Sequence, residues 1–224
     1  MARAVECHRH TAGRERLLST MAAFIQELLV AGDGPGASAA ARSALAAAAG
    51  CADRRYVRLF EIQLAAAVAT EGRYEEADAM LMAHLDGLAH RDAAATIIVA
   101  FLPYCALGAG DGAVAFDRYA AFLDDRVRAD DTVNIMFALC GLAASLVLLG
   151  RDAEAARLAG GIRRASRELG WDESYHGAEE ITGPLESLPS RMTPEQWEEE
   201  TRAGSQLSLD ELVRLAGTLT PVTG

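Results

Sequence analysis

The chain has 224 residues and a formal net charge of −11, from 21 basic and 32 acidic residues. This charge disfavours direct nucleic-acid binding, because a duplex is itself densely negative and a binding face would need a local basic patch. Hydrophobic residues make up 51% of the chain and aromatic residues only 6%, which favours Ala-rich helices that approach closely through small side chains.

No stretch is long and apolar enough to predict a membrane span. The nearest, residues 133–150, contains Asn134 and Ser145 and is interpreted as a buried helix. The N-terminus lacks the apolar core of a secretory signal. The cysteines, at positions 7, 51, 105 and 140, form no CxxC pair, as expected for buried thiols in a reducing compartment. We therefore expect a cytoplasmic protein.

The first helical pair follows a non-periodic start. Residues 1–13 are expected to be disordered. Residues 14–31 carry apolar side chains at helical spacing and predict one amphipathic helix. The sequence GDGPG at 32–36 ends it, and an Ala-rich helix is expected over 38–49.

Three further helical pairs are predicted up to Gly170, which is expected to end the last helix. Pro103 is expected to kink the first helix of the third pair. The predicted pairs are 54–70 with 74–89, 93–109 with 112–129, and 132–149 with 152–169.

A glycine and, five residues later, an alanine recur at the turns of these pairs. The glycines Gly32, Gly72, Gly110 and Gly150 are 40, 38 and 40 residues apart, which indicates a repeat protein. Each glycine is expected to adopt a left-handed conformation, and each alanine is expected at the close crossing of two helices. Residues 14–170 are therefore predicted to form four helical hairpins.

Residues 171–224 lose this rhythm and are predicted to form a helical cap and tail. A helix is expected over 173–188, followed by capping boxes at Thr193 and Ser208 that open two more helices. Such a cap would cover the apolar side of the last repeat, as terminal units of solenoids must.

The segment AxxxxxGRYEEAxxxL, from Ala66 to Leu81, is similar to the tetratricopeptide repeat, and residues 143–159 are a weaker copy. The chain departs from that family in its longer period and in Glu61 and Leu139, which stand where the family has an aromatic residue. Together with LAG at 158–160 and the tail at 193–216, residues 14–216 resemble the C-terminal region of LuxR-type, ATPase-containing transcriptional regulators of actinobacteria.

This resemblance implies an all-α, tetratricopeptide-like α-solenoid that serves as the sensor or interaction region of a bacterial transcriptional regulator. In that family an ATPase and a DNA-binding domain lie elsewhere. The chain contains no GxxxxGK[ST] phosphate loop and no recognisable DNA-reading helix pair. We therefore expect a non-catalytic binding module without a cofactor. The alternatives are a free-standing scaffold and a small-molecule-binding or metal-binding protein with a pocket in the array.

The resemblance also implies that the first helix of each pair faces the inner surface of the array. An apolar stripe placed there is interpreted either as core or as a groove for a protein or peptide helix or a hydrophobic small molecule. The stripe consists of Leu59, Ile62, Ala66, Ile97, Ala100, Tyr104, Phe137, Cys140 and Ala144.

Other candidate sites are interpreted as structural. The segment 7–10 has metal-capable side chains but no second ligand pair downstream, and the acidic pairs 124–125 and 130–131 lack a calcium-loop pattern. The basic cluster Arg163, Arg164 and Arg167 is expected to be a solvated face. Trp197 is expected to be a packing anchor, and no nucleophile motif is present.

Overall fold

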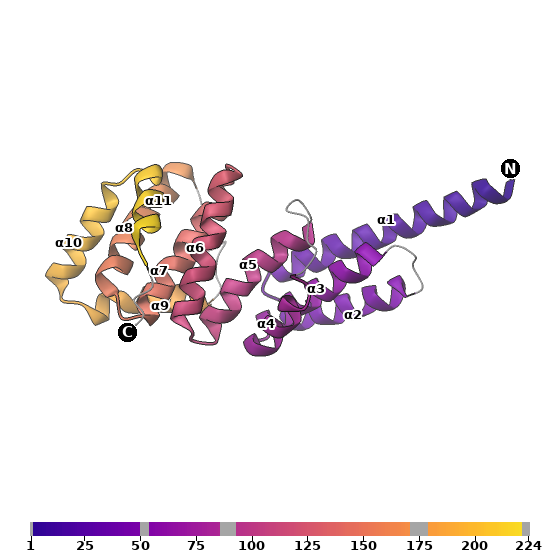
Figure 1. Ribbon diagram of the computed structural model, residues 1–224, viewed down its shortest axis with the longest axis horizontal. Coiled ribbons are helices and arrows are strands. Elements are labelled where there is room, and N and C mark those ends of the chain that lie inside the picture. Colours follow the sequence, from indigo (N-terminus) through magenta and orange to yellow (C-terminus); the bar gives the residue numbers. More distant parts are fainter. Residues whose placement is uncertain (1, 50–53, 86–92, 171–178, 221–224) are drawn as a thin grey trace. The chain divides into compact units, whose positions relative to one another are not determined.

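The computed structural model describes residues 2–49, 54–85, 93–170 and 179–220, with side chains from residue 13 onward. These residues form eleven α-helices and no strand (Figure 1), which confirms the all-α prediction. The helices are α1 (Ala2–Val30), α2 (Gly34–Ala48), α3 (Arg54–Thr70), α4 (Tyr74–Met82), α5 (Ala93–Gly108), α6 (Gly112–Arg128), α7 (Thr132–Leu148), α8 (Asp152–Leu169), α9 (Glu179–Arg191), α10 (Pro194–Ser205) and α11 (Leu209–Thr218).

Most predicted helix bounds agree with the structure, and α3 and α8 agree at both ends. The largest differences lie at α1, which begins at Ala2, and at α4, which ends at Met82. Helix α2 begins earlier than predicted because Asp33 accepts a hydrogen bond from the Gly36 N–H at its N-terminus. Helix α5 continues through Pro103.

Five helix–helix junctions share one backbone geometry. In each, three residues separate the helices, and the middle residue has a positive φ, such as 81° at Gly72. This residue donates its N–H to the carbonyl three residues back, and the next residue donates to the carbonyl five residues back. Gly72 thus bonds Ala69 at 2.9 Å, and Arg73 bonds Val68 at 3.2 Å. This is a Schellman motif whose last residue is also the N-cap of the following helix.

The predicted left-handed glycines Gly32, Gly72, Gly110 and Gly150 occupy four of these junctions. The alanines five residues later are fully buried, as predicted; they are Ala37, Ala77, Ala115 and Ala155. The fifth junction, between α6 and α7, lies between two predicted helices, but its left-handed geometry was not predicted, because Asp130 (φ 54°) takes the place of the glycine.

The junctions also reveal a longer period of 78 residues. GDGxxA at 32–37 recurs at 110–115, and GRxxEA at 72–77 recurs at 150–155. The local contacts repeat as well: Asp33 and Asp111 cap their helices, whereas Arg73 and Arg151 pair with the glutamate three residues on. The α1–α2 and α3–α4 junctions therefore share their sequence motifs and local contacts with the α5–α6 and α7–α8 junctions.

The chain divides into two compact units, Met1–Phe101 and Leu102–Gly224. In the N-terminal unit, α2 packs against α1 and α3, and α3 against α4. Its core combines buried alanines of α2 with larger side chains of α1 and α3, chiefly Leu18, Ile25 and Phe60. The Gln63 side chain donates to the Ala22 carbonyl at 2.9 Å and joins α3 to α1.

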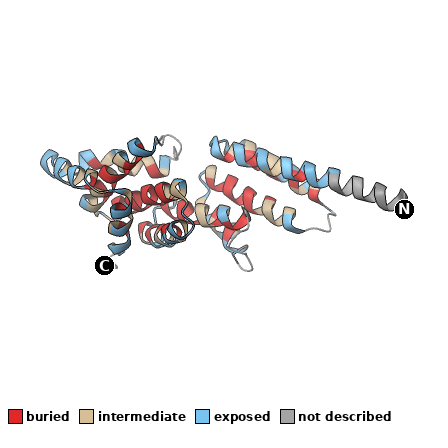
Figure 2. Ribbon diagram, turned by 90° about the horizontal axis from the view of Figure 1, so that it is seen from above, coloured by how far each residue is buried: buried red, intermediate tan, exposed pale blue. Residues whose placement is uncertain are grey.

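In the C-terminal unit, α7 lies against α6 and α8 and is buried along most of its length (Figure 2). The Tyr119 ring of α6 lies directly over Gly141 of α7, where an added Cβ would lie 2.2 Å from the ring. Phe137 contacts Tyr119 and Phe122 edge-on, with ring centroids 6.0 and 6.1 Å apart. At the crossing of α6 and α7, a glycine thus makes room for one aromatic ring, and a second aromatic ring packs beside it.

The tail packs on the last helical pair. Helix α9 contacts α7 and α8, while α10 and α11 both contact α8 (Figure 1). Both predicted capping boxes are present, at Thr193 and Ser208. Gly170 ends α8 with a φ of 63°, as predicted. Within the described part of the chain, no helix combines the length and the apolarity needed to cross a membrane.

Candidate functional site

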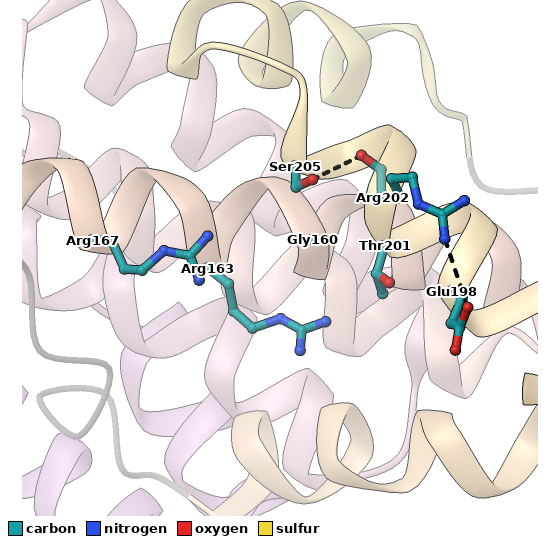
Figure 3. A pocket seen from close by; sticks show the side chains of 7 residues that line it. All are labelled: Gly160, Arg163, Arg167, Glu198, Thr201, Arg202 and Ser205. Atoms are coloured by element: carbon teal, nitrogen blue, oxygen red, sulfur yellow. Dashed lines mark hydrogen bonds and ion pairs between the residues drawn. The ribbon is translucent and has the colours of Figure 1, made fainter.

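An arginine-lined hollow lies between α8 and α10 of the C-terminal unit. Its volume is about 340 Å³, and its lining side chains come from both helices (Figure 3). Helix α8 contributes Gly160, Arg163 and Arg167, which share one helical face at spacings of three and four residues. Helix α10 contributes Glu198, Thr201, Arg202 and Ser205. We call these seven residues the arginine hollow.

The hollow exists because α8 and α10 cross at very short range. A Cβ on Gly160 would lie 2.2 Å from the Thr201 carbonyl oxygen, and one on Gly204 would lie 1.9 Å from the Arg157 carbonyl oxygen. Only glycine permits this approach. The two backbones are in contact there, so the longer side chains on either side of the crossing form the walls of the hollow.

Other arginines of α8 fix the position of α10. Arg157 donates from Nε and from a terminal nitrogen to one carboxylate oxygen of Glu200, at 2.8 and 2.7 Å. Arg164 donates to the carbonyls of Ser205 and Gln206, at 3.3 and 2.8 Å. Charged hydrogen bonds of this kind are stronger than neutral ones. The walls of the hollow are therefore held by contacts that do not use its own guanidinium groups.

The hollow carries three guanidinium groups and one carboxylate. Arg202 lies 3.6 Å from Glu198 on the same helix. The Arg163 guanidinium lies over the Trp197 ring, 5.1 Å from its centroid, in a cation–π contact. Arg167 is exposed and forms no ion pair with any described residue. The net positive charge suits an anionic group, and planar guanidinium groups suit carboxylate or phosphate oxygens.

The two hydroxyl groups of the hollow donate to backbone carbonyls of α10. Thr201 donates its hydroxyl hydrogen to the Trp197 carbonyl at 2.7 Å, and Ser205 donates to the Arg202 carbonyl at 2.8 Å. Neither hydroxyl donates to a general base, which a serine or threonine nucleophile requires. The arrangement can bind and orient an anion by charge and hydrogen bonding.

The predicted inner stripe divides between the two units. In the N-terminal unit Ile62 and Ala66 are fully buried, and Leu59, Ile97 and Ala100 are half-buried. In the C-terminal unit Tyr104, Cys140 and Ala144 are buried, and Phe137 is half-buried. All nine residues thus lose much of their surface to packing within the chain, and use of the stripe as a groove stays a prediction.

The remaining predicted sites have structural contacts or lie outside the described residues. Asp131 caps α7 through the Asn134 N–H, and Asp125 pairs with Arg126. Trp197 is half-buried beneath Arg163. The side chains of segment 7–10 are outside the described part. Among the described residues, no group of three or more His, Cys, Asp or Glu side chains could hold a metal ion.

Of the seven residues of the hollow, the sequence singled out Arg163 and Arg167, and it predicted a solvated face there, not a binding site. Arg163, Arg164 and Arg167 stand out as a basic cluster, but the structure separates them: Arg164 holds α10, whereas Arg163 and Arg167 line the hollow. Arg202 was missed because it lies among glutamates of α10 and appears balanced by them. The signal available in the sequence was the pair Gly160–Gly161, which marks a site of close helix approach.

Comparison of the chain with models of protein families, with curated proteins and with solved structures found no match. The site is therefore interpreted from its own geometry.

Proposed function

We propose that this chain is a non-catalytic, solenoid-like binding module of tetratricopeptide type, and that it is the sensor or interaction region of a bacterial transcriptional regulator. The observation that carries the binding-module proposal is the repeated junction. Five Schellman turns of one geometry connect successive helices, and the motifs at four of these turns recur with a 78-residue period. Stacked repeats of this kind present extended surfaces on which partners bind.

The surface that best suits a ligand is the arginine hollow. It is open, polar and positively charged on a chain whose net charge is −11. Arg163 and Arg167 lie one helical turn apart, and carboxylates on a partner helix at positions i and i+4 have the same spacing. We therefore propose that the hollow takes the acidic face of a peptide helix. An apolar peptide helix or a hydrophobic small molecule at the half-buried stripe residues, such as Phe137, is the second candidate.

Fluorescence of Trp197 can test binding at the hollow, because Arg163 lies over its ring. Trp171, which lies outside the described residues, is replaced by Phe so that Trp197 reports alone. The probe is a helical peptide with glutamates at i and i+4, and the control peptide carries glutamines instead. We expect saturable binding of the glutamate peptide, weakening at high salt, and about tenfold loss in Arg163→Ala/Arg167→Ala.

The matched control variant is Arg128→Ala, whose arginine is exposed on α6, away from α8 and α10. It should bind the glutamate peptide like the parent. Equal binding of the glutamate and glutamine peptides would contradict an acidic ligand. Loss of binding in a Phe137 variant, with Arg163→Ala/Arg167→Ala unchanged, would favour the apolar stripe instead.

The regulator part of the proposal is tested by the neighbouring coding sequence. An adjoining ATPase domain with a phosphate loop, together with a DNA-binding domain, would support it. A free-standing gene whose product bridges two proteins would favour a scaffold instead.

A further inference from the structure

Helix α1 has two apolar faces, of which only one is buried in its unit. Leu18, Ile25 and Leu29 lie on the inner face and are buried against α2 and α3. Leu17 and Phe24 lie on the outer face, and their exposed fractions are 54% and 57%. Much of α1 is exposed in Figure 2. Exposed apolar residues that are contiguous on a helix indicate an interaction surface.

The outer face has the spacing of a coiled-coil seam. Leu17, Met21, Phe24 and Leu28 follow one another at intervals of four, three and four residues, which is the a/d pattern of a heptad. Leu17 and Phe24 are exposed, whereas Met21 and Leu28 are half-buried where the seam borders the core of the unit. Arg14 lies one turn before Leu17, and its guanidinium is directed to the end of α2, where it donates to the Ala47 and Ala49 carbonyls at 2.9 Å. The seam itself is therefore uncharged.

Helix α5 carries apolar residues at the positions 78 residues after the seam. Ala95, Leu102 and Ala106, after Leu17, Phe24 and Leu28, are buried, and Val99, after Met21, is half-buried, whereas Thr96, after the buried Leu18, is exposed. At the other end of the chain, α8 is covered by α10 and α11. Head-to-tail stacking of α1 onto α8 of another copy is therefore blocked.

Charges beside the seam favour an antiparallel arrangement with a second α1. Arg16 and Glu27 lie on the same edge of the outer face, are exposed, and form no ion pair within the described residues. If a two-fold axis passes between residues 22 and 23, Leu17 faces Leu28 of the second copy, and Met21 faces Phe24. With a rise of 1.5 Å per residue, Arg16 then lies about 3 Å along the axis from Glu27 of the second copy.

We propose that two copies of this chain associate through the outer faces of α1, in an antiparallel, two-fold symmetric pair. The interface is isologous, so each residue contact occurs twice. Burial of the apolar seam drives the association, and the two symmetry-related contacts of Arg16 with Glu27 select the antiparallel direction.

Sedimentation velocity of the full chain over a wide concentration range tests this proposal. We expect a concentration-dependent monomer–dimer equilibrium. Phe24→Glu places a charge in the seam and should raise the dissociation constant at least about tenfold. Because Phe24 is exposed, the variant should keep the parent helix content by circular dichroism. Leu169→Glu replaces a similarly exposed apolar residue in the other unit and should leave the equilibrium unchanged.

Charge exchange tests the direction of the pair. Arg16→Glu should weaken the dimer, and the double variant Arg16→Glu/Glu27→Arg should restore it. A chain that is monomeric at all concentrations, or a dimer that Phe24→Glu does not weaken, would overturn the proposal. So would a monomer that binds an amphipathic helical peptide along α1, since the face would then be a peptide site. A double variant as weak as the single variant would overturn the antiparallel direction.

Discussion

Asp130 holds the backbone conformation that glycine holds at the four other junctions. Its φ is 54°, and its N–H still donates to Val127 at 3.2 Å, so the Schellman geometry is complete without a glycine. Asp tolerates the left-handed region better than most residues, but its Cβ still makes that region costly. The junction between α6 and α7 therefore carries a local strain that the others lack.

Asp130→Gly should stabilise the chain by about 0.5–1 kcal/mol, because it removes the Cβ that opposes a positive φ. The measurement is the midpoint of urea unfolding. The reciprocal change Gly110→Asp, at the equivalent position of another junction, should lower stability by a similar amount. If both substitutions leave the midpoint unchanged, the left-handed backbone at these positions contributes no strain.

Tyr119 is a fully buried tyrosine whose hydroxyl has no hydrogen-bond partner among the described residues. Burial raises the pKa of this hydroxyl, and nearby Cys140 and Cys105 add to the shift, so the group stays neutral. Its ring is held between Gly141 and the edge of Phe137. The ring thus contributes packing while the hydroxyl contributes an unpaired polar group.

Tyr119→Phe should stabilise the chain by about 1 kcal/mol, because a buried donor without a partner carries an uncompensated desolvation cost. Thermal or urea unfolding measures the change. Tyr56→Phe is the control: its hydroxyl donates to the Glu15 carbonyl at 3.5 Å, so its removal should cost a few tenths of a kcal/mol. A loss of stability in Tyr119→Phe would mean that a buried water satisfies the hydroxyl.

At the scale of elements, the crossing of α8 and α10 depends on backbone contact. Gly204 is buried within α10, and its Cα faces the Arg157 carbonyl of α8. The ion pair of Arg157 with Glu200 and the contacts of Arg164 lie on the same side of α10 and add to this anchor. Helix α10 is thus held on α8 by close backbone packing as well as by an ion pair and charged hydrogen bonds.

Gly204→Ala should destabilise the attachment of α10 by about 1–3 kcal/mol, because its Cβ would overlap the Arg157 carbonyl and force the helices apart. Trp197 fluorescence reports the release of α10, and thermal unfolding reports the total loss. Gly217→Ala, in the open part of α11, meets no atom within 4 Å and should instead add about 0.5–1 kcal/mol through helix propensity. Similar stabilities for the two variants would contradict the close crossing.

At the scale of the whole molecule, the sequence predicts the helices and their junctions better than the candidate binding surfaces. The turn glycines, the buried alanines and both capping boxes could be predicted from the sequence, because each depends on residues within one or two turns of helix. The junction at Asp130 could not, because aspartate carries no strong signal for a positive φ. The 78-residue period is marked both by sequence motifs and by local contacts, since Asp33 and Asp111 cap their helices whereas Arg73 and Arg151 each pair with a glutamate.

The candidate site was less predictable for a physical reason. The hollow requires α10 to cross α8 at Gly160 and Gly204, residues that lie 44 positions apart in the sequence. Local patterns do not specify which distant helix meets a small residue. For the same reason, an apolar stripe such as Ile62, Ala66 and Ala144 cannot be assigned to core or groove from spacing alone; the structure places these three among the buried residues.

The three-residue junctions contain no residue that is free of both helices, since the last residue of the Schellman motif that closes one helix is also the N-cap of the next. An inserted residue at such a place has no loop to absorb it. It must either unwind a turn or rotate the following helix by about 100° around its own axis, which would carry the buried alanine out of the interface. We therefore expect the spacing between junctions to tolerate far less change than the identity of most residues within it.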